Sequence, residues 1–303
     1  METSESFGNP IVILNPAANR GNMALHRALV RSHTKHAEAE YVETKRKGEA
    51  RELAMLAARD GRPIIVVGGD GSVHEVANGI LASGSRVPLG IVGAGSGNDY
   101  AWNTLKLPHD PNAALAIAFN GKLINIDAGM MNGTYFTNSF SVGIDADIAV
   151  AANWMKKIPL MKGATLYYST TVKQLLFGYH RCPWLSITVD GEEVSPEARR
   201  YVLAAITIGP TYGAGFRINP KADYADGLFD MCTISYTPLP RALQLLPVVQ
   251  KGEHEQLPEV TFYRPRTVRI ESQKPVNVQL DGETSQGTLF EGAILPGALR
   301  VRI

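Results

Sequence analysis

Residues 64–76 read IIVVGGDGSVHEV. The apolar run rich in β-branched residues predicts a buried strand, and the sequence after Ser72 predicts a helix. Three glycines and an aspartate lie between the two, whereas an ordinary tight turn needs one glycine. Such a turn leaves bare backbone N–H groups at the positive end of a helix, where anions bind well. This segment therefore predicts a phosphate-binding turn between a strand and a helix.

The same alternation extends through the first 126 residues. Short apolar runs predict strands at 11–14, 39–42, 64–67 and 89–92. Amphipathic stretches follow these runs, and they predict helices that begin near residues 22, 48 and 72. This order is typical of a parallel sheet with helices on both faces. We expect residues 1–126 to form a three-layer α/β nucleotide-binding domain.

Beyond residue 127 the pattern changes to strand-like runs separated by turn dipeptides. The predicted strands are 185–189, 201–208, 228–234, 268–270 and 276–280. Many short strands with Gly and Pro between them indicate an antiparallel β-sandwich. Helical insertions are expected at about 145–157 and 164–177, with a shorter one after residue 240. The second domain is thus placed at 127–303, and packing of its last strand, about 290–303, back on the first domain is left open.

Composition excludes several classes of protein. The 303 residues contain 30 Lys and Arg against 29 Asp and Glu, so no overall field favours nucleic acid as a partner. Two cysteines are too few for a disulfide framework or a four-thiolate zinc site, and no H-x-x-x-H pair occurs on a predicted helix face. His74 is expected on a helix surface. Without a signal-like N-terminus or a long apolar run, the sequence favours a cytoplasmic protein with at most peripheral membrane contact.

A second glycine cluster follows the strand predicted at 89–92. Residues 93–100 read GAGSGNDY. Because the carboxyl ends of parallel strands meet at one edge of a sheet, this loop is expected beside the first one, with a nucleotide between them. The alternative for Asn98 and Asp99 is a helix cap. Neither the P-loop motif nor the dinucleotide-binding G-x-G-x-x-G motif occurs.

These motifs resemble those of the diacylglycerol kinase catalytic-domain family, which includes bacterial soluble lipid kinases and sphingosine kinases. Residues 68–75 are similar to its GGDGT-x-x-E motif, and 95–101 to its GT-x-NDFA motif. Residues 209–228, the Asp-Gly-Glu at 281–283 and the closing strand at 295–301 follow in the family's order. Ser72 and Ser96 replace threonines but keep the hydroxyl group.

The resemblance implies transfer of the ATP γ-phosphate to a lipid hydroxyl in a cleft between the two domains. The N-terminal domain would bind ATP and the C-terminal domain the lipid. The implied nucleotide-side residues are Asn15, Thr44, Gly68, Gly69, Asp70, Gly71, Ser72, Glu75, Gly95, Ser96, Asn98 and Asp99. The alternatives are a kinase of NAD or of a sugar phosphate that shares the glycine-rich turn, and a nucleotide-binding regulator without catalysis.

An alcohol needs a base to attack phosphorus at neutral pH. The family position implies that Glu283 is this base, while the sequence leaves open whether Asp281 takes the proton instead. A second Asp-Gly-Glu occurs at residues 190–192, and we expect one of the two copies to be only a hairpin turn. Asp70 completes the expected catalytic set.

Magnesium is the expected metal because it neutralises triphosphates and prefers oxygen ligands. Asp70 and Asp99, on the phosphate side, are the acids best placed to hold it. Asp223, Asp226 and Leu228 resemble the family's separate structural metal site, with a carboxylate from Asp226 and main-chain oxygens from the other two.

Residues 148–189 contain no acidic side chain. The basic and aromatic residues there are Lys156, Lys157, Lys162, Lys173, Arg181, Trp154, Tyr167, Tyr168, Phe177, Tyr179 and Trp184. Because such side chains favour headgroup depth, the hypothesis is a basic and aromatic face at 154–184 that docks on the inner membrane surface. The alternative is a basic helix face with aromatic residues in the core. The identity of the acceptor lipid and the presence of a homodimer are left open.

Overall fold

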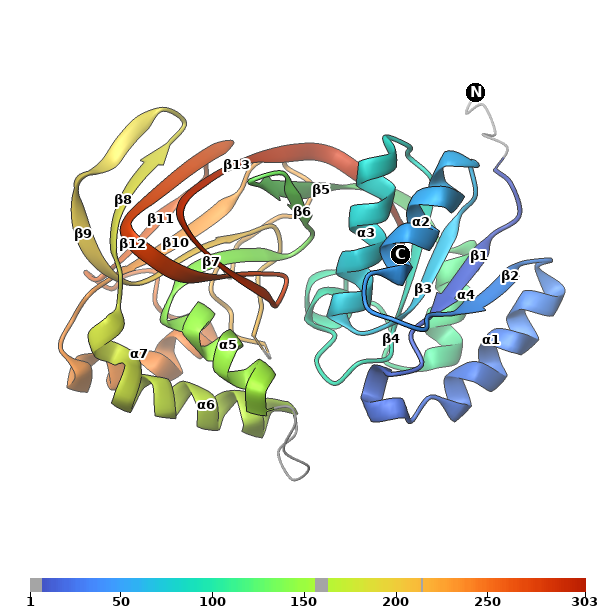
Figure 1. Cartoon of the computed structure of the whole chain (residues 1–303), viewed down its shortest axis with the longest axis horizontal. Helices are drawn as coiled ribbons and strands as arrows, with labels where there is room; N and C mark the ends of the chain where they lie inside the picture. The colour runs from blue at the N-terminus through green and yellow to red at the C-terminus, as the bar shows by residue number, and fades with distance from the viewer. Residues whose placement is uncertain (1–6, 156–162, 214) are drawn as a thin grey trace. The chain divides into compact units, whose positions relative to one another are not determined.

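The computed structural model describes residues 7–155, 163–213 and 215–303 (Figure 1). The chain divides into two compact units. One comprises the described residues up to Ile126 together with Gly297–Ile303, and the other comprises the described residues of Asp127–Pro296. The chain passes from one unit to the other within β5 (Leu123–Met131) and again within β13 (Glu283–Arg302).

The first unit is built on a parallel sheet. Its strands, in spatial order, are β2 (Glu40–Glu43), β1 (Ile11–Leu14), β3 (Ile64–Gly68) and β4 (Pro88–Gly93). The end of β13 adds a further parallel strand, in which Arg300 and Val301 pair with Pro88 and Leu89. Every residue of β1 and β3 is buried, as expected for strands that are covered on both faces.

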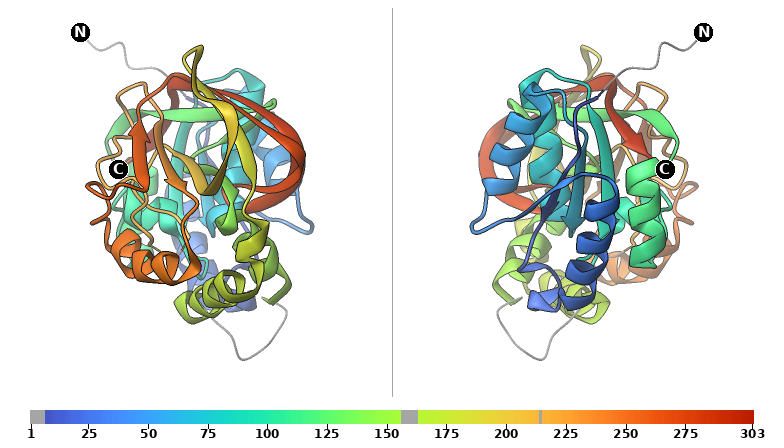
Figure 2. Two further views of the ribbon diagram at one scale, coloured as in Figure 1. Left: turned by 90° about the vertical axis from the view of Figure 1, so that its left-hand side faces the viewer. Right: turned by 90° about the vertical axis from the view of Figure 1, so that its right-hand side faces the viewer.

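Helices cover both faces of this sheet (Figure 2). They are α1 (Ala24–His36) and α4 (Pro111–Asn120) on one face and α2 (Glu49–Arg59) and α3 (Asp70–Ser83) on the other. The helix α2 packs closely on α3 at Gly79, where a Cβ atom would lie 2.4 Å from the carbonyl oxygen of Arg51. The predicted three-layer α/β architecture is confirmed.

The expectation that His74 lies on a helix surface is wrong. Its side chain is only 8% exposed, and Asn78, one turn further along α3, donates a hydrogen bond to its carbonyl oxygen at 2.9 Å. The helix α3 is buried along most of its circumference, because it packs on β3 and β4 and α2 lies closely against its side. Polar side chains such as that of His74 are therefore buried along with the apolar ones.

The second unit contains the remaining strands. They are β6 (Thr134–Phe136), β7 (Ser139–Gly143), β8 (Trp184–Val189), β9 (Glu192–Thr207), β10 (Asp230–Ser235), β11 (Val260–Tyr263) and β12 (Thr267–Leu280), with most of β5 and β13. The pairings among β7–β12, and those of β5 with β6 and of β12 with β13, are antiparallel. The long strand β9 pairs with β8 through its first half and with β7 and β10 through its second half.

Alternation along β9 separates two hydrophobic cores. Ala204 and Ile206 face the interior of the sandwich, whereas Leu203 and Ala205 face a group of helices. These helices are α5 (Ile144–Met155), α6 (Gly163–Gly178) and α7 (Leu239–Lys251), followed after α6 by the short η3 (Tyr179–Arg181) (Figure 1). The predicted antiparallel sandwich with helical insertions is confirmed. Within the described residues, no helix has both the length and the apolarity that crossing a membrane requires.

Candidate active site

The first glycine-rich turn connects β3 to α3. Gly68 has no room for a side chain, since a Cβ atom would lie 2.5 Å from the Ser72 Oγ. The Ser72 hydroxyl accepts a hydrogen bond from the Asn15 side-chain amide at 2.9 Å, so both side chains are held against the turn. Gly69 is the N-cap residue of α3, and no side chain among the described residues caps this end. The turn thus presents the uncapped, positive end of a helix.

The second glycine cluster lies directly against the first. A Cβ atom on Gly95 would lie 2.6 Å from the Cα of Gly69, so the two loops touch backbone to backbone. Asn98 holds this loop in shape: its side chain accepts from the Gly95 N–H at 2.8 Å and donates to the Gly95 carbonyl at 2.9 Å. Asn98 is also the N-cap residue of the short helix η2 (Asp99–Thr104), but its side chain does not cap that helix. Ser96 remains exposed at the tip.

Asp70 connects the two loops. Its Oδ1 accepts a hydrogen bond from the Tyr100 N–H at 3.2 Å. Burial, and secondly the negative charge of Asp99, raise the pKa of Asp70 to about 6, while the N–H groups of the second loop lower it. Asp99 is buried and accepts a hydrogen bond from the Asn103 side chain at 2.7 Å. Two neighbouring carboxylates that repel each other are a suitable setting for a bound cation.

Two further residues of the predicted nucleotide site, Glu75 and Thr44, lie in the first unit, in α3 and just after β2. The carboxylate of Glu75, on α3, accepts a hydrogen bond from the Gly48 N–H at 2.9 Å and so fixes the start of α2. Thr44 follows β2 directly, is half-buried, and donates its N–H to the Leu14 carbonyl at 3.0 Å. Glu75 therefore has a structural contact in addition to its predicted place in the site.

The Asp-Gly-Glu at 281–283 forms the hairpin between β12 and β13 in the second unit. Asp281 and Gly282 adopt φ values of +49° and +87°, which a two-residue type I′ turn requires. The Asp281 carboxylate accepts four hydrogen bonds, from the Thr137 N–H and hydroxyl at 2.8 and 3.1 Å and from the N–H groups of Asn138 and Ser139 at 2.9 and 3.0 Å. Glu283 is half-buried at the start of β13.

The copy at 190–192 forms the hairpin between β8 and β9 with the same turn. Its φ values are +50° at Asp190 and +84° at Gly191. The Asp190 carboxylate accepts from the N–H groups of Arg266 and Thr267, both at 2.8 Å, and from the Thr267 hydroxyl at 3.2 Å. Here the aspartate and Glu192 are both exposed.

The three residues of the predicted second metal site form one loop before β10. Asp223 accepts from the Ala225 N–H and Asp226 from the Leu228 N–H, both at 3.0 Å. The other oxygen of Asp226 is paired with Arg264. Asp230, buried nearby, has one carboxylate oxygen without a hydrogen-bond partner in the described part of the chain.

Both sets of acids fit magnesium by the chemistry of their donors, which are carboxylate and main-chain oxygens. A cation at Asp226 would replace or adjoin the Arg264 guanidinium, which already neutralises that carboxylate. Among the described residues, no three His, Cys, Asp or Glu side chains are arranged as a complete metal site.

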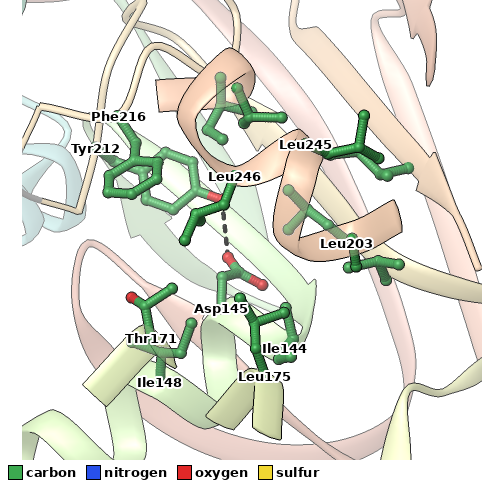
Figure 3. Close-up of a pocket in the computed structure, with 15 residues that line it drawn as sticks. Ile144, Asp145, Ile148, Thr171, Leu175, Leu203, Tyr212, Phe216, Leu245 and Leu246 are labelled. Atoms are coloured by element: carbon green, nitrogen blue, oxygen red, sulfur yellow. Dashed lines mark hydrogen bonds between the residues drawn. The ribbon is translucent and has the colours of Figure 1, made fainter. Parts of the chain in front are cut away.

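Sequence reasoning missed an apolar pocket in the second unit (Figure 3). It has a volume of about 80 Å³ and lies between α5, α6, α7 and the strands β9 and β10. Apart from Asp145, Thr171 and Tyr212, every side chain that lines it is a hydrocarbon. Its lining comes from residues 144–249, which no local pattern brings together, so the sequence carried no signal for it.

Comparison with known proteins identifies the class. Residues 9–131 match the family described as "Diacylglycerol kinase catalytic domain", and residues 138–303 match "YegS C-terminal NAD kinase beta sandwich-like domain". A diacylglycerol kinase of Mycobacterium tuberculosis (strain CDC 1551 / Oshkosh) is 30% identical, over 97% of this chain and 95% of that protein. A "Probable lipid kinase YegS-like" of Chromohalobacter salexigens is 33% identical, over 83% of this chain and 79% of that protein.

Solved structures share the fold. Two crystal structures of Bacillus anthracis str. Sterne proteins superpose with TM-scores of 0.81 and 0.72, at 21% and 20% identity. The superpositions include 100% and 98% of this chain, respectively, and 97% of each Bacillus anthracis chain. The second is described as a diacylglycerol kinase.

The glycine-rich α/β unit and the sandwich unit, with these matches, define the chain as a kinase. It belongs to the diacylglycerol kinase catalytic-domain family, with a YegS-type C-terminal domain. The resemblance inferred from the motifs at 68–75, 95–101 and 281–283 is therefore confirmed.

Proposed function

We propose that this protein transfers the γ-phosphate of ATP to the hydroxyl group of a diacylglycerol-like lipid. The observation that carries the lipid acceptor is the apolar pocket between α5, α6 and α7. A lining made almost wholly of hydrocarbon side chains suits an acyl chain, whereas NAD or a sugar phosphate would leave its polar groups without partners there. The pocket thus favours a lipid over both polar acceptors.

The nucleotide is assigned to the first unit. The uncapped N-terminus of α3 and the glycine loops that touch at Gly69 and Gly95 offer N–H groups to phosphate oxygens without side chains in the way. In this assignment Asn98 and Glu75 act by holding loop and helix in place, as their hydrogen bonds to Gly95 and Gly48 indicate. Ser96, exposed at the loop tip, is free to contact the phosphates.

Glu283 is assigned as the general base. The four hydrogen bonds that Asp281 accepts support this choice, because they stabilise the charged form of Asp281 and leave it poorly suited to take a proton. Asp281 instead positions the hairpin that carries Glu283. Turnover then requires the bound nucleotide and Glu283 to meet, and the acceptor hydroxyl loses its proton to Glu283 as it attacks phosphorus.

Magnesium is assigned to two places. Asp70 and Asp99 would hold the ion that accompanies ATP, and Asp223, Asp226 and the main chain at Leu228 would hold a structural ion in the second unit. Magnesium, when bound, neutralises phosphate charge.

The proposed function includes docking on an anionic membrane through α6 and the start of β8. Leu176, Phe177 and Trp184 are 50%, 70% and 56% exposed, and Lys173 and Arg181 are exposed close to them in the sequence. Exposed apolar side chains beside basic ones suit the headgroup region of a membrane. Lys156, Lys157 and Lys162 lie outside the described residues, as do the side chains of Trp154, Tyr167 and Tyr168.

Activity is tested with labelled ATP and a panel of acceptors: diacylglycerol, phosphatidylglycerol, a sphingoid base, NAD and fructose 6-phosphate. Label confined to the organic phase supports the proposal. Label on NAD or the sugar phosphate would identify the polar-substrate kinase instead. Nucleotide binding with no labelled acceptor would favour the regulator.

Membrane docking is tested by sedimentation with vesicles of phosphatidylglycerol and phosphatidylcholine. The double variant L176S/F177S should lose most vesicle binding. The matched control is L25S, which changes a leucine that is 61% exposed on α1, and it should bind as the wild type does. Equal binding by both variants would contradict docking through α6.

A further inference from the structure

Asp145 is the one charged side chain in the lining of the apolar pocket that the described residues form. It lies in the first turn of α5 and is 8% exposed. The Tyr212 hydroxyl donates a hydrogen bond to its Oδ2 at 2.8 Å. Its Oδ1 is buried and has no hydrogen-bond partner among the described residues. Figure 3 shows this carboxylate bonded to Tyr212, within a lining that is otherwise mostly hydrocarbon.

The Ser141 hydroxyl and the N–H groups at the start of α5 lower the pKa of Asp145 without bonding to its Oδ1, which stays open to a donor from a bound ligand. A buried carboxylate oxygen without a hydrogen bond is destabilising, and a plain acyl chain would exclude water from it without supplying a donor. We infer that the pocket selects lipids whose aliphatic chain carries a hydroxyl group, which donates a hydrogen bond to Asp145 Oδ1. This inference rests on the proposed lipid kinase activity.

The chemistry of the pocket favours a hydroxyl over other polar groups. Burial raises the pKa of Asp145 to about 6, so the carboxylate is mainly ionised at neutral pH and can only accept. A carbonyl or ester group in the chain therefore cannot satisfy it. An ammonium group would pair with the charge, but its other two N–H groups would find acceptors only at the Thr171 and Tyr212 hydroxyls of an otherwise hydrocarbon lining. A hydroxyl group brings one donor to the unpartnered Oδ1.

The size of the pocket limits where the hydroxyl can lie. A cavity needs roughly 10–15 Å³ to hold one water molecule. The pocket, at about 80 Å³, therefore holds only a short segment of an acyl chain. The hydroxyl must then fall within that segment. Selection is expected to depend on its position along the chain.

The turnover experiment uses diacylglycerols whose acyl chains carry one hydroxyl at successive positions, with the unsubstituted lipid as reference. For the best-placed isomer, the wild type should show at least a tenfold higher kcat/KM than for the reference lipid, because a site built around a hydrogen bond discriminates against analogues that lack it. The D145L variant should lose this preference. The control I148V changes the lining without touching the carboxylate and should keep the ratio.

A binding experiment separates this inference from the proposed activity. Calorimetric titration of hydroxylated and plain monoacylglycerols into the whole protein measures pocket selectivity without turnover. The wild type should bind the best-placed hydroxylated lipid at least tenfold more tightly, and D145L should bind both equally. Circular dichroism melting establishes that D145L is folded.

The outcomes are distinct. Binding selectivity that D145L abolishes, with no phosphorylated lipid, supports the pocket and overturns the kinase proposal. Phosphorylation of plain and hydroxylated lipids with equal kcat/KM and equal affinity overturns the inference and leaves the kinase proposal standing. Tighter binding of a long-chain amine than of every hydroxylated lipid also overturns it, since the partner of Asp145 would then be an ammonium group.

Discussion

The hairpins at residues 190–192 and 281–283 have the same sequence, Asp-Gly-Glu, and the same turn. Their aspartates have φ values of +50° and +49°, and their glycines +84° and +87°. In both, the aspartate carboxylate accepts main-chain N–H groups from residues just before or within a neighbouring strand. The local geometry of the two copies does not distinguish them.

They differ in what surrounds them. Asp190 and Glu192 are exposed, whereas Asp281 and Glu283 are half-buried. The hairpin at 281–283 is also tied to β7 through Gln279, which accepts from the Gly282 N–H at 2.8 Å and donates to the Ser141 hydroxyl at 2.9 Å. The turn is therefore a property of the three residues, while the hold on the hairpin that carries Glu283 comes from the surrounding network. A catalytic base requires such positioning.

The largest expected difference is in kcat, between variants of the two glutamates, Glu283 and Glu192. E283Q should lower kcat by about 10²–10⁴-fold, because a general base typically contributes that much. E192Q should leave kcat unchanged. Phosphorylated lipid is measured under saturating ATP, and nucleotide affinity is measured in parallel. Full turnover by E283Q with normal ATP affinity would remove the distinction between the two hairpins.

A smaller difference is expected in stability, between variants of the two aspartates, Asp281 and Asp190. D281N should lower the free energy of unfolding by about 2–3 kcal/mol, because an amide NH₂ would then face N–H donors that a carboxylate accepts. D190N should lower it by about 1 kcal/mol, because its contacts are exposed to water. Urea denaturation measures both. D281N should also lower kcat, whereas D190N should not. Equal destabilisation would mean that the deeper network adds nothing.

The smallest effect is expected from the glycines. G282A and G191A should each lower the free energy of unfolding by about 1 kcal/mol, since both positions have positive φ and neither has an atom within 4 Å of a new Cβ. Denaturation curves should agree within error. A much larger loss in G282A would indicate strain from the surrounding network rather than from the turn.

Much of the fold could be predicted from local patterns. The strand, glycines and helix at 64–76 follow directly from the sequence, because a buried parallel strand and an amphipathic helix have different periods. Both Asp-Gly pairs also indicated hairpins. The burial of His74 was mispredicted because it depends on the elements that pack around α3.

Less of the candidate site could be predicted. The sequence suggested that Asn98 contacts a ligand or caps a helix. Its side chain instead hydrogen-bonds to Gly95. This contact depends on the left-handed φ of +58° at Asn98, which the sequence does not specify. Asp145 appeared only as an acid at the start of a helix. Its pocket combines distant segments, so tertiary structure was needed to recognise it.

The return of β13 to the first unit bears on the order in which a ribosome makes the protein. Residues 297–303 complete the sheet beside β4, but they are synthesised after all of residues 127–296. The edge of β4 in the nascent first unit therefore stays unpaired while the sandwich is translated. An unpaired strand edge can form hydrogen bonds with other chains. Chaperone dependence during translation, rather than after release, is the expected consequence.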